Sequence, residues 1–137
     1  MRHFLLKSEP DVFSWAMQQA NGVEPWTGVR NAQAAAVLRS MELGDLAFFY
    51  HSNIGREVVG IVEVVRTAYP DPTAEDGRWV CVDVKAVESL PRPVTLAAIK
   101  AEPRLAGIPL VRQSRLSCME IGAGHWAVIR EMGGLAP

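Results

Sequence analysis

The chain has 137 residues, 49% hydrophobic and 21% charged, which are ordinary proportions for a globular domain large enough to build a core without disulfides or metals. Its 14 basic and 15 acidic residues give a formal net charge of −1, which argues against a protein that grips phosphates over a broad basic surface and leaves room only for a small basic patch. The two cysteines, Cys81 and Cys118, lie far apart without metal-ligand neighbours, so neither a disulfide framework nor a zinc site is expected.

No hydrophobic run approaches the length needed to cross a bilayer, and no charged-then-hydrophobic leader precedes the first strand-like segment. We therefore expect one domain over residues 1–137, working in the reducing cytoplasm. We expect it to be a monomer with no cofactor and no metal ion.

The N-terminal segment predicts one strand and one short helix. Residues 3–7 are mostly hydrophobic and form a strand that Pro10 stops, because proline restricts the residue before it and cannot donate to a β-ladder. Ser14 is placed to cap a helix over residues 15–20. Residues 23–28 predict no regular structure.

A second helix is predicted over residues 32–41. Asn31 is placed to cap it, and its four alanines are the strongest helix formers. Gly44 is expected to close its C-terminal end.

Residues 46–53 predict a strand that is buried on both faces and ends in polar groups. Five hydrophobic or aromatic residues follow one another without a break, and His51, Ser52 and Asn53 come directly after them. Such a strand can carry hydrogen-bonding groups out of the core to the wall of a pocket. It can equally end in an ordinary polar turn, and the segment alone leaves both interpretations open.

The rest of the chain predicts strands over residues 57–67, 79–87 and 118–121 and helical segments over residues 96–101, 104–106 and 125–132. Thr95 is placed to cap the helix over residues 96–101. Residues 68–73 contain two prolines and are expected to lie outside any helix or central strand. Pro91 and Pro93 are expected to end the strand before them. Five or six strands and four or five short helices that do not alternate regularly predict an α+β fold, a curved antiparallel or mixed sheet or barrel with helices packed outside.

Enzyme chemistry finds little support in the motifs. The sequence has no Gly-x-Ser-x-Gly elbow, no phosphate-binding glycine loop and no His-Glu-x-x-His. His51, Ser52 and an acidic residue such as Glu9 can be assembled into a triad on paper, but any chain of this size allows that. We do not expect an enzyme.

Two segments point instead to recognition of a ligand. Trp26 precedes Gly28 in a loop that leads to a helix N-terminus, so it can present its ring to a ligand or lie in the core. Arg112 and Arg115 stand three residues apart, with Gln113 and Ser114 between them. Two such arginines can clamp phosphate oxygens as bidentate donors or simply cover the surface.

Seven stretches, taken in order, resemble the EVE domain family, a branch of the PUA-like fold. They span nearly the whole chain, at residues 5–10, 26–31, 49–53, 60–64, 68–73, 90–94 and 110–117. The resemblance implies a PUA-like barrel of five or six strands, similar to the YTH domain that captures methylated adenine in RNA. It also implies non-catalytic binding of a modified base in nucleic acid, with modified cytosine in DNA as the main expectation. Modified RNA and a small molecule or nucleoside in the same cavity are the alternatives.

The resemblance also assigns site residues by position. The ligand-binding residues would be Ser8, Trp26, Asn31, His51, Ser52 and Asn53. Contacts to the nucleic-acid backbone would come from Lys7, Arg30, Arg112, Gln113, Ser114 and Arg115. Thr27 replaces the family's usual acidic residue, and the loop at residues 74–78 is shorter than in many relatives, so both features bear on which ligand is bound.

Overall fold

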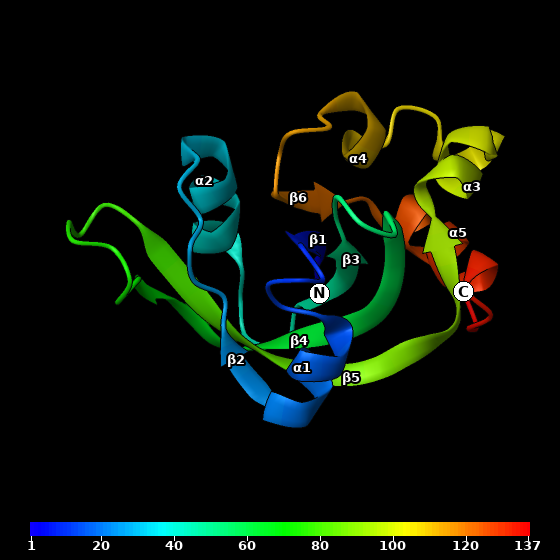
Figure 1. Cartoon of the computed structure of the whole chain (residues 1–137). Coiled ribbons are helices and arrows are strands. Elements are labelled where there is room, and N and C mark those ends of the chain that lie inside the picture. The colour runs from blue at the N-terminus through cyan, green and yellow to red at the C-terminus, as the bar shows by residue number, and fades with distance from the viewer.

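A strongly curved six-stranded sheet organises the chain, with the strand order β2-β5-β4-β3-β1-β6 (Figure 1). The computed structural model describes residues 1–137, all of the sequence. The strands are β1 (His3–Ser8), β2 (Val23–Pro25), β3 (Leu46–His51), β4 (Glu57–Pro70), β5 (Val80–Thr95) and β6 (Cys118–Ile121). Only β1 and β3 pair in parallel, so the sheet is mixed, and β2 and β6 form its two open edges. The predicted α+β class is confirmed, and the strand pairing does not close the sheet into a barrel.

Helices lie outside this sheet at both ends of the molecule (Figure 1). They are α1 (Trp15–Asn21), α2 (Ala32–Ser40), α3 (Leu96–Ala101), the 3₁₀ turn η1 (Pro103–Leu105), α4 (Pro109–Arg112) and α5 (Ala123–Met132). The side chains of Ser14, Asn31 and Thr95 accept hydrogen bonds from backbone N–H groups in the first turns of α1, α2 and α3, as the sequence predicts. None of these helices is both long enough and apolar enough to span a membrane.

The long hairpin of β4 and β5 corrects two predictions. Strand β4 continues to Pro70, which pairs with Val80, so the predicted end of this strand at residue 67 is wrong. Strand β5 runs on through Pro91 and Pro93 to Thr95. Strand β4 extends beyond its pairing with β3, and β5 extends beyond its pairing with β2, so each has one unpaired edge there. A proline on such an edge removes no hydrogen bond from the sheet.

Two smaller differences concern turns. No regular structure is predicted for residues 23–25, but they pair with β5 and form the short edge strand β2. Helix α2 ends at Ser40, where the N–H of Met41 bonds to the carbonyl of Leu38, and not at Gly44. Gly44 lies in the turn before β3 with a φ of +89°, a conformation that glycine adopts without strain.

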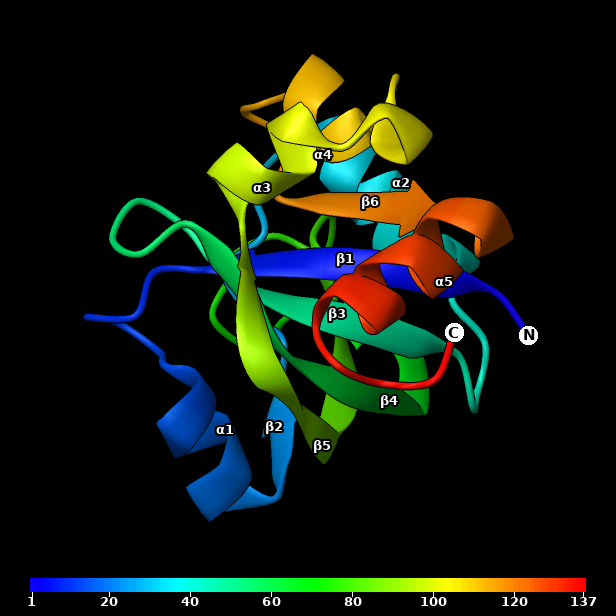
Figure 2. The same ribbon diagram turned by 90° about the vertical axis from the view of Figure 1, so that its right-hand side faces the viewer.

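The core lies between the sheet and the helices around it, and α5 crosses the strands in Figure 2. The Trp126 indole on α5 stacks against His3 of β1 at 4.4 Å and Phe48 of β3 at 3.9 Å between ring centroids. On another part of the sheet the Trp15 ring covers Gly60 so closely that a Cβ atom there would lie 2.3 Å from the ring.

The parallel pairing of β1 and β3 positions the functional region. Parallel neighbours cannot be joined by a tight turn, so the chain makes a long connection between them over residues 9–45. This connection carries α1, β2 and α2, together with the loop that holds Trp26.

Candidate functional site

A cavity of about 410 Å³ opens where the end of β1 meets the connection between β1 and β3. This volume lies within the range of pockets that hold small ligands. Its wall mixes hydrophobic, polar and basic groups and is formed by Lys7, Ser8, Val12, Phe13, Glu24, Pro25, Trp26, Thr27, Gly28, Val29, Arg30 and Ser117. Of the residues predicted to contact ligand or backbone, it brings together Lys7, Ser8, Trp26 and Arg30.

Trp26 is held firmly although it sits in a loop. Its backbone N–H donates to the carbonyl of Val82 in β5 at 2.7 Å. Its ring meets those of Phe13 and Phe49 in edge-to-face contacts, with centroids 6.1 and 5.5 Å away. Only 7% of the residue is exposed, yet no other aromatic ring is stacked on its faces. The indole is therefore a fixed part of the cavity wall.

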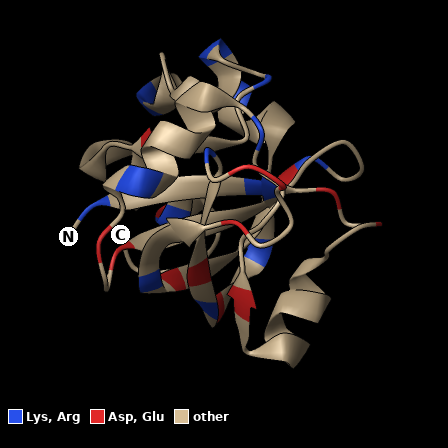
Figure 3. Cartoon of the chain, turned by 90° about the vertical axis from the view of Figure 1, so that its left-hand side faces the viewer, with Lys and Arg blue, Asp and Glu red and all other residues tan.

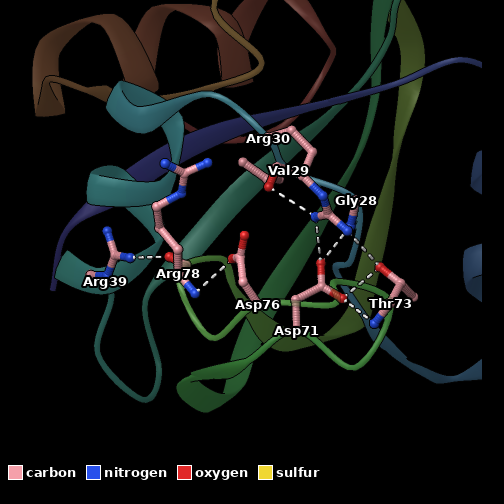
Figure 4. A network of polar contacts seen from close by, with 8 residues as sticks. All are labelled: Gly28, Val29, Arg30, Arg39, Asp71, Thr73, Asp76 and Arg78. Carbon is pink, nitrogen blue, oxygen red and sulfur yellow. Dashed lines mark hydrogen bonds and ion pairs between the residues drawn. The ribbon is translucent and has the colours of Figure 1, made fainter.

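The buried carboxylate of Asp71 ties the Trp26 loop to the hairpin between β4 and β5 (Figure 4). Its Oδ2 accepts from the backbone N–H of Gly28 at 2.8 Å and from Arg30 Nη1 at 3.0 Å. Its Oδ1 accepts from the N–H of Thr73 at 2.8 Å and from the Thr73 hydroxyl at 2.6 Å. Burial by itself raises the pKa of Asp71, but the hydrogen bonds from Thr73, Gly28 and Arg30 outweigh it and lower the pKa to about 2.

Lys7 and Ser8 close the β1 side of the cavity. The Lys7 ammonium donates to the carbonyl of Ser114 at 2.8 Å, and partial burial lowers its pKa. The Ser8 hydroxyl donates to the carbonyl of Phe13 at 2.6 Å and so fixes the turn that presents Phe13 to the cavity.

His51, Ser52 and Asn53 do not line this cavity. The Nε2 atom of His51 accepts the backbone N–H of Trp15 at 3.0 Å, so neutral His51 serves as a second cap for α1. Burial lowers the pKa of His51, against an opposing attraction from Glu57. The N–H of Ser52 donates to the carbonyl of Ser8, and Asn53 is exposed in the β3–β4 turn with a φ of +66°.

A second, more open hollow of about 330 Å³ lies next to the first. It is lined by Asn31, Gln33, Gln113, Ser114, Arg115 and Leu116. The Gln33 amide donates to Gln113 at 2.9 Å across it, while the Asn31 oxygen caps α2 through the N–H of Ala34. The bond from Lys7 to Ser114 joins the two hollows. Arg112 is exposed nearby and lines neither.

Charges around these hollows are mixed. In the view of Figure 3, Lys and Arg segments are scattered over several elements, with Asp and Glu segments among them. No group of three or more His, Cys, Asp or Glu residues is arranged to hold a metal ion. Both cysteines are buried as free thiols, and burial raises the pKa of Cys118 to about 12.

Sequence reasoning missed Phe13 and Asp71. The spacing of Asp71 and Thr73 is that of a turn in which an aspartate accepts the N–H two residues later, and this signal was visible. The bonds from Asp71 to Gly28 and Arg30 cross more than 40 positions of sequence, and no local pattern reports them. Thr27 lines the cavity, whereas the short loop at residues 74–78 lies outside its wall.

The EVE domain family matches residues 2–132 of this sequence. The chain belongs to the EVE domain family. Thymocyte nuclear protein 1 of Gallus gallus is 39% identical over 124 residues, and that of Homo sapiens is 35% identical over 125 residues. Each match covers 72% of this chain but only 51% and 56% of those proteins, so the chain spans about half the length of the curated relatives it matches.

Solved EVE structures superpose closely on this fold. A crystal structure of a protein from Agrobacterium tumefaciens is 48% identical with a TM-score of 0.96, covering 99% of this chain and 95% of the other. Human THYN1 in complex with DNA that contains 5-methylcytosine is 30% identical with a TM-score of 0.91, and the match covers 100% of both chains. A YTH domain from Zygosaccharomyces rouxii, at 17% identity and a TM-score of 0.63, shares the fold.

Proposed function

We propose that this EVE domain binds a modified base in nucleic acid, with a modified cytosine in DNA as its ligand, and that it does so as a monomer without catalysing a reaction. The observation that carries the proposal is the cavity beside Trp26 in a chain that superposes over its full length on a protein solved with 5-methylcytosine DNA. Nucleic-acid binding is thus supported by the family, and the particular base is the proposal.

The physical chemistry of the cavity suits one extruded base. A base that leaves its stack loses a few kcal/mol, least from a single strand or a damaged pair. Stacking on an aromatic side chain such as Trp26 returns about 1–3 kcal/mol. The Ser8 hydroxyl donates its hydrogen to Phe13, and its oxygen can still accept a bond from the base. The hydroxyls of Thr27 and Ser117 stand in the same wall and can bond to the edge of the base. A base with the wrong edge would leave them unpaired, which favours selectivity.

The other predicted contacts fit a ligand longer than one nucleotide. The hollow around Asn31, Gln113, Ser114 and Arg115 continues from the cavity, and we propose that the neighbouring backbone runs there. Arg112 would act at its outer end. His51, Ser52 and Asn53 stay proposed contacts for a nucleotide outside the cavity.

The test compares matched oligonucleotides that differ only in one methylated cytosine, as single and double strands of DNA and as RNA. We expect tighter binding of a methylated DNA strand, and equal affinity for methylated and unmethylated strands of every kind would overturn the proposal. A preference for the RNA set would move the ligand from DNA to RNA.

Two matched tryptophan variants locate the site. Trp26→Phe keeps an aromatic ring but shrinks it, and Trp26→Ala removes it, with an expected loss of roughly 5- to 150-fold in affinity, the equivalent of about 1–3 kcal/mol. Trp126→Phe is the control, because Trp126 is equally buried at 6% exposure and lies away from the cavity. We expect it to bind like the unaltered protein.

A further inference from the structure

The hydrogen bonds of Arg30 leave one edge of its guanidinium free. Nη1 donates to the carbonyl of Val29 at 3.1 Å and to Asp71 at 3.0 Å, and Nη2 donates to the Thr73 hydroxyl at 3.0 Å. Asp71 and Thr73 are hydrogen-bonded to each other and together accept from the two terminal nitrogens of the guanidinium. Of the five N–H groups of an arginine, Nε–H and one Nη2–H then have no partner in the structure.

This free edge is open to a ligand. The side chain of Arg30 is 38% exposed, whereas that of Asp71 behind it is fully buried. Arg30 lines the cavity that also holds Trp26. Two parallel N–H groups on one edge of a guanidinium match two oxygens of a phosphate.

The Asp71 carboxylate takes only one N–H of Arg30 and leaves the free edge of the guanidinium open to an anion. Its two oxygens are shared among four donors, of which Arg30 supplies one and the loops around Gly28 and Thr73 supply the rest. The carboxylate lies on the protein side of the guanidinium, so an anion would approach from the opposite, open side.

We propose that Arg30 is a preorganised phosphate contact for the nucleotide whose base enters the cavity, and that Asp71 and Thr73 are its positioning residues. The inference rests on the proposed function, because it needs a nucleic-acid ligand. It adds that one oxygen of Asp71 positions the proposed base contact and the proposed phosphate contact together. Oδ2 accepts from Gly28 in the Trp26 loop and from Arg30. The Arg30 side chain is already held in one conformation in the folded protein, so it loses little rotamer freedom when the phosphate binds.

The experiment measures affinity for a methylated DNA oligonucleotide over a range of salt concentrations. Arg30→Gln is expected to weaken binding about tenfold and to lower the slope of log K against log salt by about one phosphate contact. The ratio of affinities for methylated and unmethylated strands should stay unchanged, because a phosphate contact carries no information on the base.

Arg104→Gln is the matched control. Arg104 also pairs with an acidic side chain, Glu102 at 2.9 Å, and is 50% exposed, but it lines neither hollow. The substitution removes the same charge, and the salt slope of this variant is expected to equal that of the unaltered protein within experimental error.

Asp71→Asn separates positioning from general electrostatics. This substitution removes a negative charge, so charge alone would raise the affinity for DNA; misplacement of Arg30 lowers it and also lowers the salt slope. Thr73→Val is the second probe if Asp71→Asn does not fold, since it removes only the hydroxyl that holds Nη2 and should weaken binding, while Thr73→Ser should restore it.

The outcomes separate the two proposals. If the unaltered protein does not discriminate methylated from unmethylated strands, the proposed function fails. If it discriminates and Arg30→Gln keeps the full salt slope, or Asp71→Asn and Thr73→Val bind as tightly as the unaltered protein, the phosphate contact or its positioning is overturned and the proposed function stands.

Discussion

The regions around Trp26 and Trp126 use the same residue in opposite ways. Both tryptophans are almost completely buried, with 7% and 6% of their surface exposed. Trp126 stands on a helix with rings stacked on it by His3 and Phe48. Trp26 stands in a loop, touches Phe13 and Phe49 edge to face, and lines a cavity.

The difference shows that degree of burial does not distinguish a tryptophan packed in the core from one that lines a cavity. What separates them is how the ring faces are used and what holds the backbone. Stacked neighbours fill the space around Trp126, whereas a backbone bond to Val82 and the polar contacts of Asp71 hold the Trp26 loop and leave the adjoining space empty. This is the ring that we propose to stack on the base.

The largest expected effect comes from truncating the packed ring. Trp126→Ala should lower the free energy of unfolding by about 3–5 kcal/mol, because it leaves a cavity and removes stacked partners. Chemical denaturation followed by circular dichroism measures this. Affinity of the folded fraction for nucleic acid should not change, and a selective loss of binding in this variant would erase the contrast with Trp26.

A substitution at Gly60 examines a third tryptophan, Trp15, whose ring packs directly on the sheet at that residue. A Cβ at Gly60 would lie 2.3 Å from the Trp15 ring, so Gly60→Ala must displace the ring and should cost about 1–3 kcal/mol. Gly77→Ala is the control, because nothing lies within 4 Å of its Cβ position and its φ is not positive. Equal denaturation midpoints for the two variants would show that the ring has room to move.

Strong acid should weaken the hold of Asp71 on the Trp26 loop. The pKa of Asp71 is about 2 in the folded protein against an ordinary value of 3.8, so its contribution is fully present above pH 4 and is lost as the pH falls through 2. The loss amounts to about 2 kcal/mol. Unfolding measured between pH 5 and pH 2 should show it, and Asp71→Asn should flatten that part of the curve; an unchanged curve contradicts the assignment.

The smallest effect concerns the two histidines that belong to the two regions. Burial lowers the pKa of both His51 and His3 below 6.5, so each contributes stability above pH 6.5 that is lost as the pH falls through its folded value. His51 bonds to Trp15 at the start of α1, and α1 follows the turn that carries Phe13 into the cavity wall. Binding should therefore weaken as the pH falls below 6.5.

His51→Gln keeps an oxygen to accept the Trp15 N–H and does not titrate, so it should remove this pH dependence of binding. His3→Gln should alter only the pH dependence of stability. The assignment of His51 to the cavity region is contradicted if His3→Gln changes the pH dependence of affinity and His51→Gln does not.

The sequence predicts the elements better than it predicts their partners. Caps at Ser14, Asn31 and Thr95 follow from local chemistry and are confirmed. The strand character of residues 68–70 was hidden because proline is tolerated wherever a strand edge is free, and edges are set by the whole sheet. Whether the barrel-like arrangement closes also depends on distant pairings.

The site shows the same limit. The resemblance assigns Ser8 and Trp26 to the ligand and Lys7 and Arg30 to the nucleic-acid backbone, and all four lie in the wall of one cavity. The use of His51 as an acceptor for Trp15 depends on a contact across 36 positions, which no spacing reveals. A polar residue at a strand end can support the chain as readily as it can face a ligand.

The position of β1 has a consequence for how the protein is made. This strand lies between β3 and β6, so residues 3–8 cannot complete their pairing until residues 118–121 have left the ribosome. Pairings so distant in sequence make folding slow. Lys7 and Ser117 face each other across that late pairing, through the bond from the Lys7 N–H to the Ser117 carbonyl at 2.9 Å. The cavity beside Trp26 is therefore among the last parts of the molecule to form during synthesis, and a ribosome-bound chain that lacks residues 117–121 cannot complete its wall.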